Sequence, residues 1–194
     1  MTRSMRGSPA AAKRARPPRP ERARLKSLRV LPRPGNRARG WLTAGPFRVA
    51  CALGRSGIAR DKREGDGATP AGRFRLLWAY FRPDSARPAA GGAPLHPLRR
   101  DSGWCENPAS ARYNRPVRLP ADGADRMWRE DALYDLTFVL DHNFSRRCKG
   151  RGSAIFFHLA RPGLTPTAGC VAIAAADMRK LAPRLARGAT MRIG

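Results

Sequence analysis

A cysteine and a histidine near the C-terminal end of the chain have the spacing of a catalytic pair. An apolar run ends on His158, and Cys170 opens a second apolar run after a loop rich in Pro, Gly and Thr. A cysteine attacks as its thiolate, and a neighbouring imidazole can take the thiol proton or stabilise the charge. The pattern therefore predicts cysteine-dependent acyl transfer, although either residue alone would also fit a place in the core. For a catalytic Cys170 we expect a depressed pKa and faster alkylation near neutral pH than at the other cysteines.

The loop before Cys170 has residues that suit an oxyanion hole. Residues 165–167 form a rigid polar loop, and Gly169 allows the backbone to approach a substrate closely. The backbone N–H groups of Ala168, Gly169 and Cys170 can then converge on one point. Donors placed there would stabilise the oxyanion of an acyl-transfer intermediate.

Strands must bring these residues together, and the hydrophobic pattern predicts them. Residues 72–81 alternate arginine with large apolar residues, which is the period of a half-buried strand. Further strands are predicted over residues 28–31, 47–53, 133–140, 154–159, 170–173 and 190–193. A helix is predicted over residues 175–181, extending towards 186 past Pro183, and a shorter one over 125–131. The fold class is therefore mostly β, a sandwich or barrel with one or two short helices rather than a doubly wound sheet.

The middle of the chain, residues 82–131, is rich in Pro, Gly and Asp and is too long for a hairpin loop. Long ordered loops in compact domains tend to be lids or binding loops. Trp104, Tyr113 and Trp128 lie in this segment. We expect these aromatic side chains to line a groove.

Charge is strongly positive and uneven. The net charge is +25, and residues 1–39 contain 13 Lys or Arg and one acid, Glu21. Residues 1–24 are predicted to be a disordered basic tail rich in Arg and Pro, followed by a catalytic domain over 25–194. A basic surface favours nucleic acid, anionic lipid or an acidic wall polymer, and charge alone does not choose among them.

The cysteines and histidines do not suggest a metal site. No cysteines form a CxxC pair and no histidines have zinc spacing. The remaining histidines are weaker catalytic candidates, because His142 follows a strand in a loop and His96 lies between prolines. If Cys170 is catalytic it must be free, which leaves at most one disulfide, and Cys105–Cys148 is the pair we favour. The sequence shows no apolar run near the length of a membrane span and no recognisable signal peptide.

Two separated segments resemble the L,D-transpeptidase (YkuD-type) catalytic domain. Residues 66–74, Asp-Gly-Ala-Thr-Pro-Ala-Gly-Arg-Phe, are similar to the family's Asp-Gly-x-Thr-Pro-x-Gly-x-Phe segment. Residues 158–173 are similar to its His…[Ser/Thr]-x-Gly-Cys signature. Segments around Trp104, Tyr113, Leu133 and Gly152 look like a divergent proteobacterial branch, so that the resemblance covers roughly residues 40–194.

The resemblance implies a YkuD-like β-sandwich that acts on peptidoglycan stem peptides at the cell wall, in the periplasm. Cys170 would be the nucleophile, His158 its base, Thr167 the motif's Ser/Thr, and Gly169 with Cys170 the oxyanion donors. No metal and no organic cofactor is implied, because thioester exchange needs only nucleophile, base and oxyanion donors. A monomer is favoured, and no nucleic acid is expected as a partner.

Two positions depart from the family pattern. The histidine that usually precedes the glycine is Ala168, and the arginine usually found two residues after the cysteine is Ala172. Another arginine, such as Arg63 or Arg115, could replace the missing one. The implied substrate-binding residues are Arg63, Trp104, Tyr113, Asn114 and Arg115.

Three functions stay open on the sequence. The leading hypothesis is a transpeptidase that makes 3–3 or 1–3 cross-links through a cysteine thioester. The second sends the acyl group to water, as an L,D-carboxypeptidase or amidase with the same cysteine. The third is a basic nucleic-acid-binding domain without catalysis, which is disfavoured because aromatic and basic residues are not interleaved as on a stacking platform.

Overall fold

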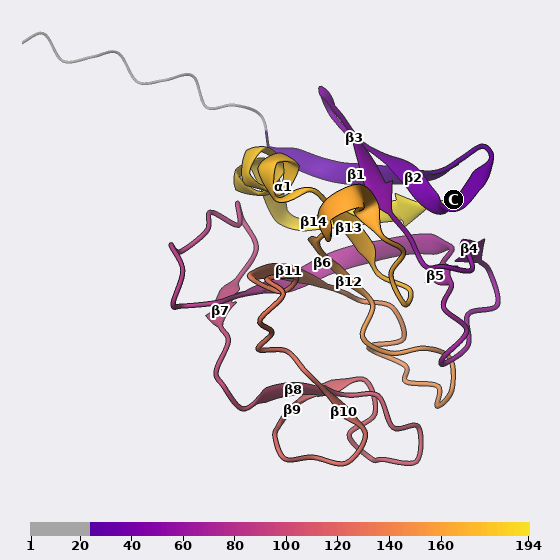
Figure 1. The fold of residues 1–194 in the computed structure, drawn as a ribbon, viewed down its shortest axis with the longest axis vertical. Helices are drawn as coiled ribbons and strands as arrows, with labels where there is room; N and C mark the ends of the chain where they lie inside the picture. Colours follow the sequence, from indigo (N-terminus) through magenta and orange to yellow (C-terminus); the bar gives the residue numbers. More distant parts are fainter. Residues whose placement is uncertain (1–23) are drawn as a thin grey trace, which may run out of the picture.

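A computed structural model describes residues 24–194, and the chain there is mostly β (Figure 1). The main sheet has nine strands in the order β11-β12-β13-β3-β2-β1-β14-β6-β7, and β11 also pairs with β6. This extra pairing joins β11, at one end of the sheet, to β6, next to the other end, so that the sheet curls around the larger part of the core. The strands are β1 (Leu25–Arg33), β2 (Asn36–Ala44), β3 (Phe47–Ala52), β6 (Gly72–Phe81), β7 (Leu95–Pro97), β11 (Leu136–Leu140), β12 (Phe156–Leu159), β13 (Val171–Ile173) and β14 (Leu185–Ile193). Apart from Arg24, the predicted tail lies outside the described residues.

Two small sheets complete the β structure. One has the order β10-β8-β9 and lies beyond the main sheet, at the bottom of Figure 1. The other pairs β4 with β5. Their bounds are β8 (Ser102–Cys105), β9 (Arg115–Arg118), β10 (Ala124–Arg126), β4 (Ile58–Ala59) and β5 (Thr69–Pro70).

The predicted helix over residues 125–131 is wrong. Residues 124–126 form β10, in which Ala124 pairs with Cys105 and Arg126 with Gly103. A helix of two turns is not stable by itself in water, so pairing with a neighbouring strand decides the conformation.

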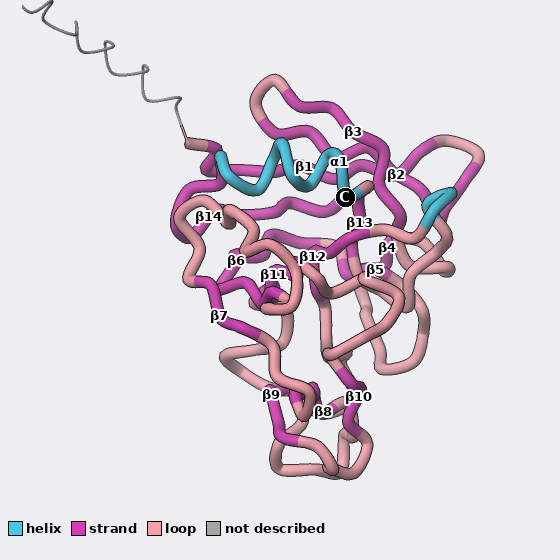
Figure 2. Tube along the Cα trace, turned by 60° about the vertical axis from the view of Figure 1, so that its left-hand side comes forward, coloured by secondary structure: helices cyan, strands magenta, loops and turns pink. Residues whose placement is uncertain are grey.

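The helix α1 (Ala175–Leu181) has the bounds that the sequence predicts, and Figure 2 shows it alongside β1. It does not extend to residue 186. Pro183 lies in the 3-10 turn η2 (Ala182–Arg184), and β14 begins directly after it. Proline removes a helical N–H and clashes with the preceding turn, which explains the end of the helix. A second 3-10 turn, η1 (Pro162–Leu164), lies in the loop before Cys170.

The core has two parts. The larger lies inside the curled sheet and includes Leu28, Val30, Phe138, Phe157 and Met191. The smaller lies between the main sheet and the β8–β10 sheet, and it contains the buried members Trp104, Met127, Tyr134, Phe156 and Cys170. Cys170 therefore lies where the main sheet packs against the middle segment, residues 82–131.

The suggested Cys105–Cys148 disulfide is absent. All four cysteines are free thiols: Cys105 is buried in β8, whereas Cys148 is exposed in a loop. The expectation came from counting cysteines, and counting carries no information on which side chains share a surface.

Candidate active site

Parallel pairing of β12 with β13 brings the predicted nucleophile and base to one face of the sheet. His158 is in register with Ala172, and Phe157 with Val171, so Cys170 lies just before β13 and opposite the start of β12. Alternate residues of a strand share a face, which places Cys170 on the same side as Ala172 and His158. Cys170 and His158 line one pocket of about 190 Å³.

The Cys170 thiol is held by the backbone of the facing strand. Its Sγ donates to the carbonyl of Ala154 at 3.2 Å and accepts the N–H of Phe156 at 3.3 Å. The residue is only 8% exposed, and burial raises the pKa of its thiol to about 12. The expectation of a depressed pKa is therefore wrong for the free protein, because charge in a buried site is disfavoured. Cys170 rests as a neutral thiol.

His158 is held in the form that can accept a proton. Its Nδ1 is 2.8 Å from the carbonyl oxygen of Leu159, and a carbonyl only accepts, so the ring proton lies on Nδ1. Nε2 is then the free base. Burial lowers the pKa of His158 to about 4, and Tyr134 packs edge-on against the ring with centroids 5.2 Å apart. The imidazole is thus neutral and oriented at neutral pH.

Thr167 organises the loop that precedes the cysteine. Its hydroxyl donates to the carbonyl of Cys170 at 2.7 Å and accepts the N–H of Gly169 at 3.1 Å. The backbone of Thr167 is bonded on both sides, to the carbonyl of Leu53 and to the N–H of Arg55. The N–H of Gly169 is therefore engaged within the loop, and this loop is fixed to the end of β3.

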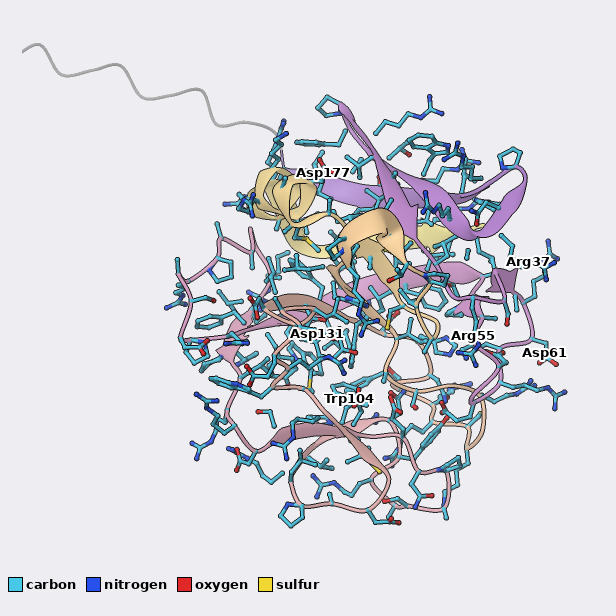
Figure 3. All side chains as sticks on the ribbon, viewed as in Figure 1. Arg37, Arg55, Asp61, Trp104, Asp131 and Asp177 are labelled. Carbon is cyan, nitrogen blue, oxygen red and sulfur yellow. The ribbon has the colours of Figure 1, made fainter. Side chains whose placement is uncertain are left out.

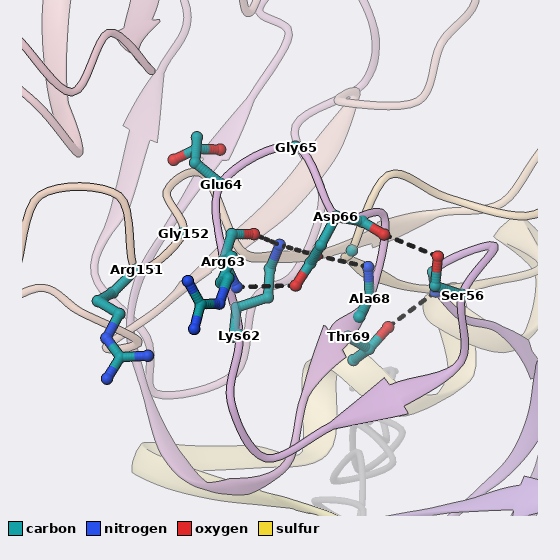
Figure 4. A network of polar contacts seen from close by, with 12 residues as sticks. Ser56, Lys62, Arg63, Glu64, Gly65, Asp66, Ala68, Thr69, Arg151 and Gly152 are labelled. Carbon is teal, nitrogen blue, oxygen red and sulfur yellow. Dashed lines mark hydrogen bonds and ion pairs between the residues drawn. The ribbon is translucent and has the colours of Figure 1, made fainter.

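The Asp66–Phe74 segment forms the platform beneath that loop. The Thr69 hydroxyl accepts the N–H of Gly54 at 2.8 Å. Asp66 accepts the N–H groups of Arg63 and Ala68 and pairs with the buried ammonium of Lys62 (Figure 4). A Cβ on Gly169 would lie 2.8 Å from the carbonyl oxygen of Ala68. The two separated sequence motifs thus meet in space, with the first supporting the second.

Comparison with known proteins agrees with this arrangement. The family model of the L,D-transpeptidase catalytic domain (YkuD) matches residues 26–193, nearly the whole chain. The chain belongs to the L,D-transpeptidase catalytic-domain family. No curated protein and no solved structure matches it. Members of this family are cysteine-dependent enzymes that act on the peptidoglycan of the cell wall.

Three of the implied substrate-binding residues are buried in this L,D-transpeptidase domain. Trp104, labelled in Figure 3, and Tyr113 are each 1% exposed. Trp104 Nε1 donates to Asn114 Oδ1, and the same oxygen accepts the N–H of Ala154 at 3.1 Å. Tyr113 donates its hydroxyl to Glu64. Their contacts position the Ala154 segment that holds the Cys170 thiol.

The two arginines proposed to replace the missing family arginine lie outside the pocket. Arg63 is 72% exposed and pairs with Asp61. Arg115 stacks over Phe144 and donates to the carbonyls of Asn114 and Phe144. Neither lines the cavity at Cys170.

The pocket wall contains charged residues that the sequence did not single out. Asp125, Arg129 and Arg161 line it, together with Tyr134 and Ala172. Asp131, labelled in Figure 3, accepts from Arg129 and Arg161 at 2.8 Å each and so ties the two guanidiniums together. The bond from Arg129, followed by that from Arg161, lowers the pKa of Asp131. The sequence signal nearby was the Leu133-Tyr-Asp-Leu resemblance, which did not include these charged residues.

Neither a metal cluster nor a membrane helix is found within residues 24–194. No group of three or more His, Cys, Asp or Glu side chains in that range could hold an ion. No helix of that part of the chain is long and apolar enough to cross a membrane.

Because Cys170 rests as a neutral thiol, the order in which the cysteines are alkylated can be predicted. We expect iodoacetamide to modify exposed Cys148 first at neutral pH, and Cys170 slowly, because its raised pKa leaves little thiolate. The rate at Cys170 should rise about tenfold per pH unit between about pH 7 and 9, well below its pKa. Mass spectrometry of the labelled peptides measures both. Faster labelling of Cys170 than of Cys148 at neutral pH would instead indicate a preformed thiolate.

Proposed function

We propose that this protein is a peptidoglycan L,D-transpeptidase in which Cys170 forms a thioester with a stem peptide. The observation that carries the proposal is the shared pocket: a free imidazole Nε2 on His158 and the Cys170 thiol face the same cavity. Both groups are neutral, so the proton must move as the thiol attacks, by general-base catalysis.

Cys170 and His158 together account for every proton transfer and every bond change at the stem carbonyl in this reaction. Nε2 of His158 takes the Sγ proton while sulfur bonds to the stem carbonyl carbon, and the carbonyl oxygen becomes an oxyanion. The N–H of Cys170 is the donor we assign to it, because the N–H of Gly169 is engaged by Thr167. Collapse of the intermediate breaks the peptide bond, and His158 returns the proton to the leaving amine. An amine of a second stem then attacks the thioester, loses its proton to His158, and regenerates the thiol.

The charged pocket wall suits the carboxylates of stem peptides. Arg161 is 48% exposed and directed to the wall by Asp131, and Arg129 lies beside it. A guanidinium pairs with a carboxylate bidentately, which orients the substrate as well as binding it. We assign to Arg161, with Arg129, the substrate contact that the family arginine at position 172 would supply.

Arg161→Gln should therefore weaken binding more than chemistry. We expect KM for a carboxylate-bearing stem to rise about tenfold, the worth of one charge-assisted hydrogen bond, with a smaller change in kcat. KM for the same stem with its carboxylate amidated should be nearly unaffected by the substitution. Arg63→Gln is the matched control, because its side chain lies outside the pocket. A larger rise in KM from Arg63→Gln than from Arg161→Gln would show that Arg63, and not Arg161, contacts the substrate.

Purified muropeptides test the proposed function directly. The protein and its Cys170→Ala variant are incubated with them, and the products are analysed by mass spectrometry. Cys170-dependent dimers support transpeptidation, and fragmentation of the dimers distinguishes 3–3 from 1–3 links. Shortened monomers without dimers would indicate an L,D-carboxypeptidase instead. No Cys170-dependent change in any muropeptide would overturn the proposal.

A further inference from the structure

A row of arginines crosses the exposed face of the main sheet. Arg73 on β6 is in register with Arg192 on β14, and Arg192 with Arg29 on β1. The row continues through Thr43 on β2 to Arg48 on β3. All four arginine side chains are exposed. These five strands are consecutive in the sheet, in the order β3-β2-β1-β14-β6, so the four arginines form one line, here called the arginine row.

The arginine row is unfavourable within the isolated domain. Neighbouring strands lie about 4.8 Å apart, so the Cα atoms of residues 73, 192 and 29 lie within about 10 Å along the row. Like charges directly opposite on paired strands destabilise the pairing. No carboxylate among residues 24–194 forms an ion pair with any of the four. Arg75, two positions along β6, differs in being paired with Asp141. The described part of the chain thus leaves the row's charge uncompensated.

One end of the arginine row opens into a hollow. Arg73 and Arg192 line it together with Arg60, and Ile58 and Gly194 are also among its lining residues. Arg60, which is not a member of the row, therefore adds one more cation at this end. The combination of a line of cations and a hollow fits an extended chain that carries several anionic groups.

The arginine row is separate from the pocket at Cys170. The lining of that pocket comes from β10, β12, β13 and the loops around them, and from none of the five strands of the row. Binding at the row therefore leaves the pocket free. A polymer held there would keep the enzyme on its substrate between reactions.

We propose that the arginine row is a second, non-catalytic surface that binds the carboxylates of the peptidoglycan polymer. This rests on the proposed function, since it takes the wall polymer as the substrate. Trp41 is the aromatic side chain beside the row, and the guanidiniums of Arg48 and Arg33 lie over its ring at 4.8 and 6.0 Å. A ring covered in this way is not available to stack on a base or to enter a lipid surface. The geometry therefore favours an acidic wall polymer over nucleic acid or membrane.

Sedimentation with purified, protein-free sacculi tests this proposal. The row variant is Arg29→Gln, Arg73→Gln and Arg192→Gln combined, made in the Cys170→Ala chain so that no turnover occurs. Arg146→Gln, Arg179→Gln and Lys180→Gln combined remove the same charge from exposed positions outside the row. We expect the row variant to bind at least about tenfold more weakly than the control, because each surface cation contributes a factor of a few to binding an anionic surface. Sacculi with chemically amidated carboxyls should bind both variants equally.

Stability and activity measurements separate this proposal from its alternatives. Because the substitutions relieve repulsion, the row variant should unfold at the same or higher temperature than its parent. When the three row substitutions are made in the chain that keeps Cys170, we expect normal turnover of soluble muropeptides. If the proposed function is wrong, this turnover is absent but binding to sacculi is unaffected. Equal sacculus binding by row and control variants would overturn the proposal. So would row-dependent binding confined to phosphatidylglycerol vesicles or to a single-stranded DNA oligonucleotide.

Discussion

Replacing His158 by glutamine is expected to lower kcat/KM for muropeptides by about 10²–10⁴-fold, the usual worth of a positioned general base. The resting thiol of Cys170 has a pKa raised to about 12, so the protein supplies almost no thiolate without a base. Nε2 of His158 is the free base in the same pocket. Steady-state kinetics on purified muropeptides measures the loss.

The pH profile separates a base from a merely structural histidine. Burial lowers the pKa of His158 to about 4, so the neutral, active form persists above that pH. Wild-type kcat/KM should therefore fall only as the pH drops through about 4, and the glutamine variant should lack this acid limb. His96→Gln, at an exposed position in β7, is the matched control and should keep normal activity. A His158→Gln variant that folds and retains more than about a tenth of the activity would contradict the assignment.

Gly169→Ala is expected to cost at least about 10²-fold in kcat/KM, because displacement of an oxyanion donor has effects of this size. Gly169 has φ of +148°, and an added Cβ would lie 2.8 Å from the backbone oxygen of Ala68. That oxygen belongs to the platform segment, whose N–H of Ala68 is held by Asp66. We expect the loop, including the N–H of Cys170, to shift instead. Muropeptide kinetics and thermal unfolding, measured together, separate this shift from global loss of fold.

Gly150→Ala is the control for backbone strain in this experiment. Gly150 has φ of +76°, and a Cβ there meets no atom within 4 Å. Its substitution imposes an unfavourable backbone conformation without a collision. Equal activity of the two alanine variants would show that the contact between Gly169 and Ala68 does not position the oxyanion donor.

The Cys170–His158 pair was predictable because its signal is local. Each residue lies at the end of a short apolar run, and the connecting loop is rich in Pro, Gly and Thr. Parallel pairing of β12 with β13 then sets Cys170 opposite the start of β12, two positions from His158 and on the same face. The helix over residues 175–181 was also predictable, whereas its expected extension past Pro183 did not form, because Pro183 lies in a 3-10 turn.

The protonation states of Cys170 and His158 were not predictable from the sequence in the same way. A thiol beside an imidazole suggested a depressed pKa, but the structure buries both side chains and moves the pKa of Cys170 up and that of His158 down. Burial depends on what distant segments cover, and no window of the sequence contains that information. The same holds for residues 124–126, where pairing with β8 replaced the predicted helix.

The sequence by itself therefore indicated the family, which the family model confirms, and the proposed nucleophile and base, because these depend on residue types in short, ordered motifs. Tertiary structure alone decided the wall of the pocket. Arg129 and Arg161 come from segments about thirty positions apart and meet only through Asp131, whereas Trp104 and Tyr113, expected in a groove, became core. The physical reason is that a pocket wall is assembled by long-range packing. Which charged side chains face the substrate depends on which apolar ones are buried beneath them.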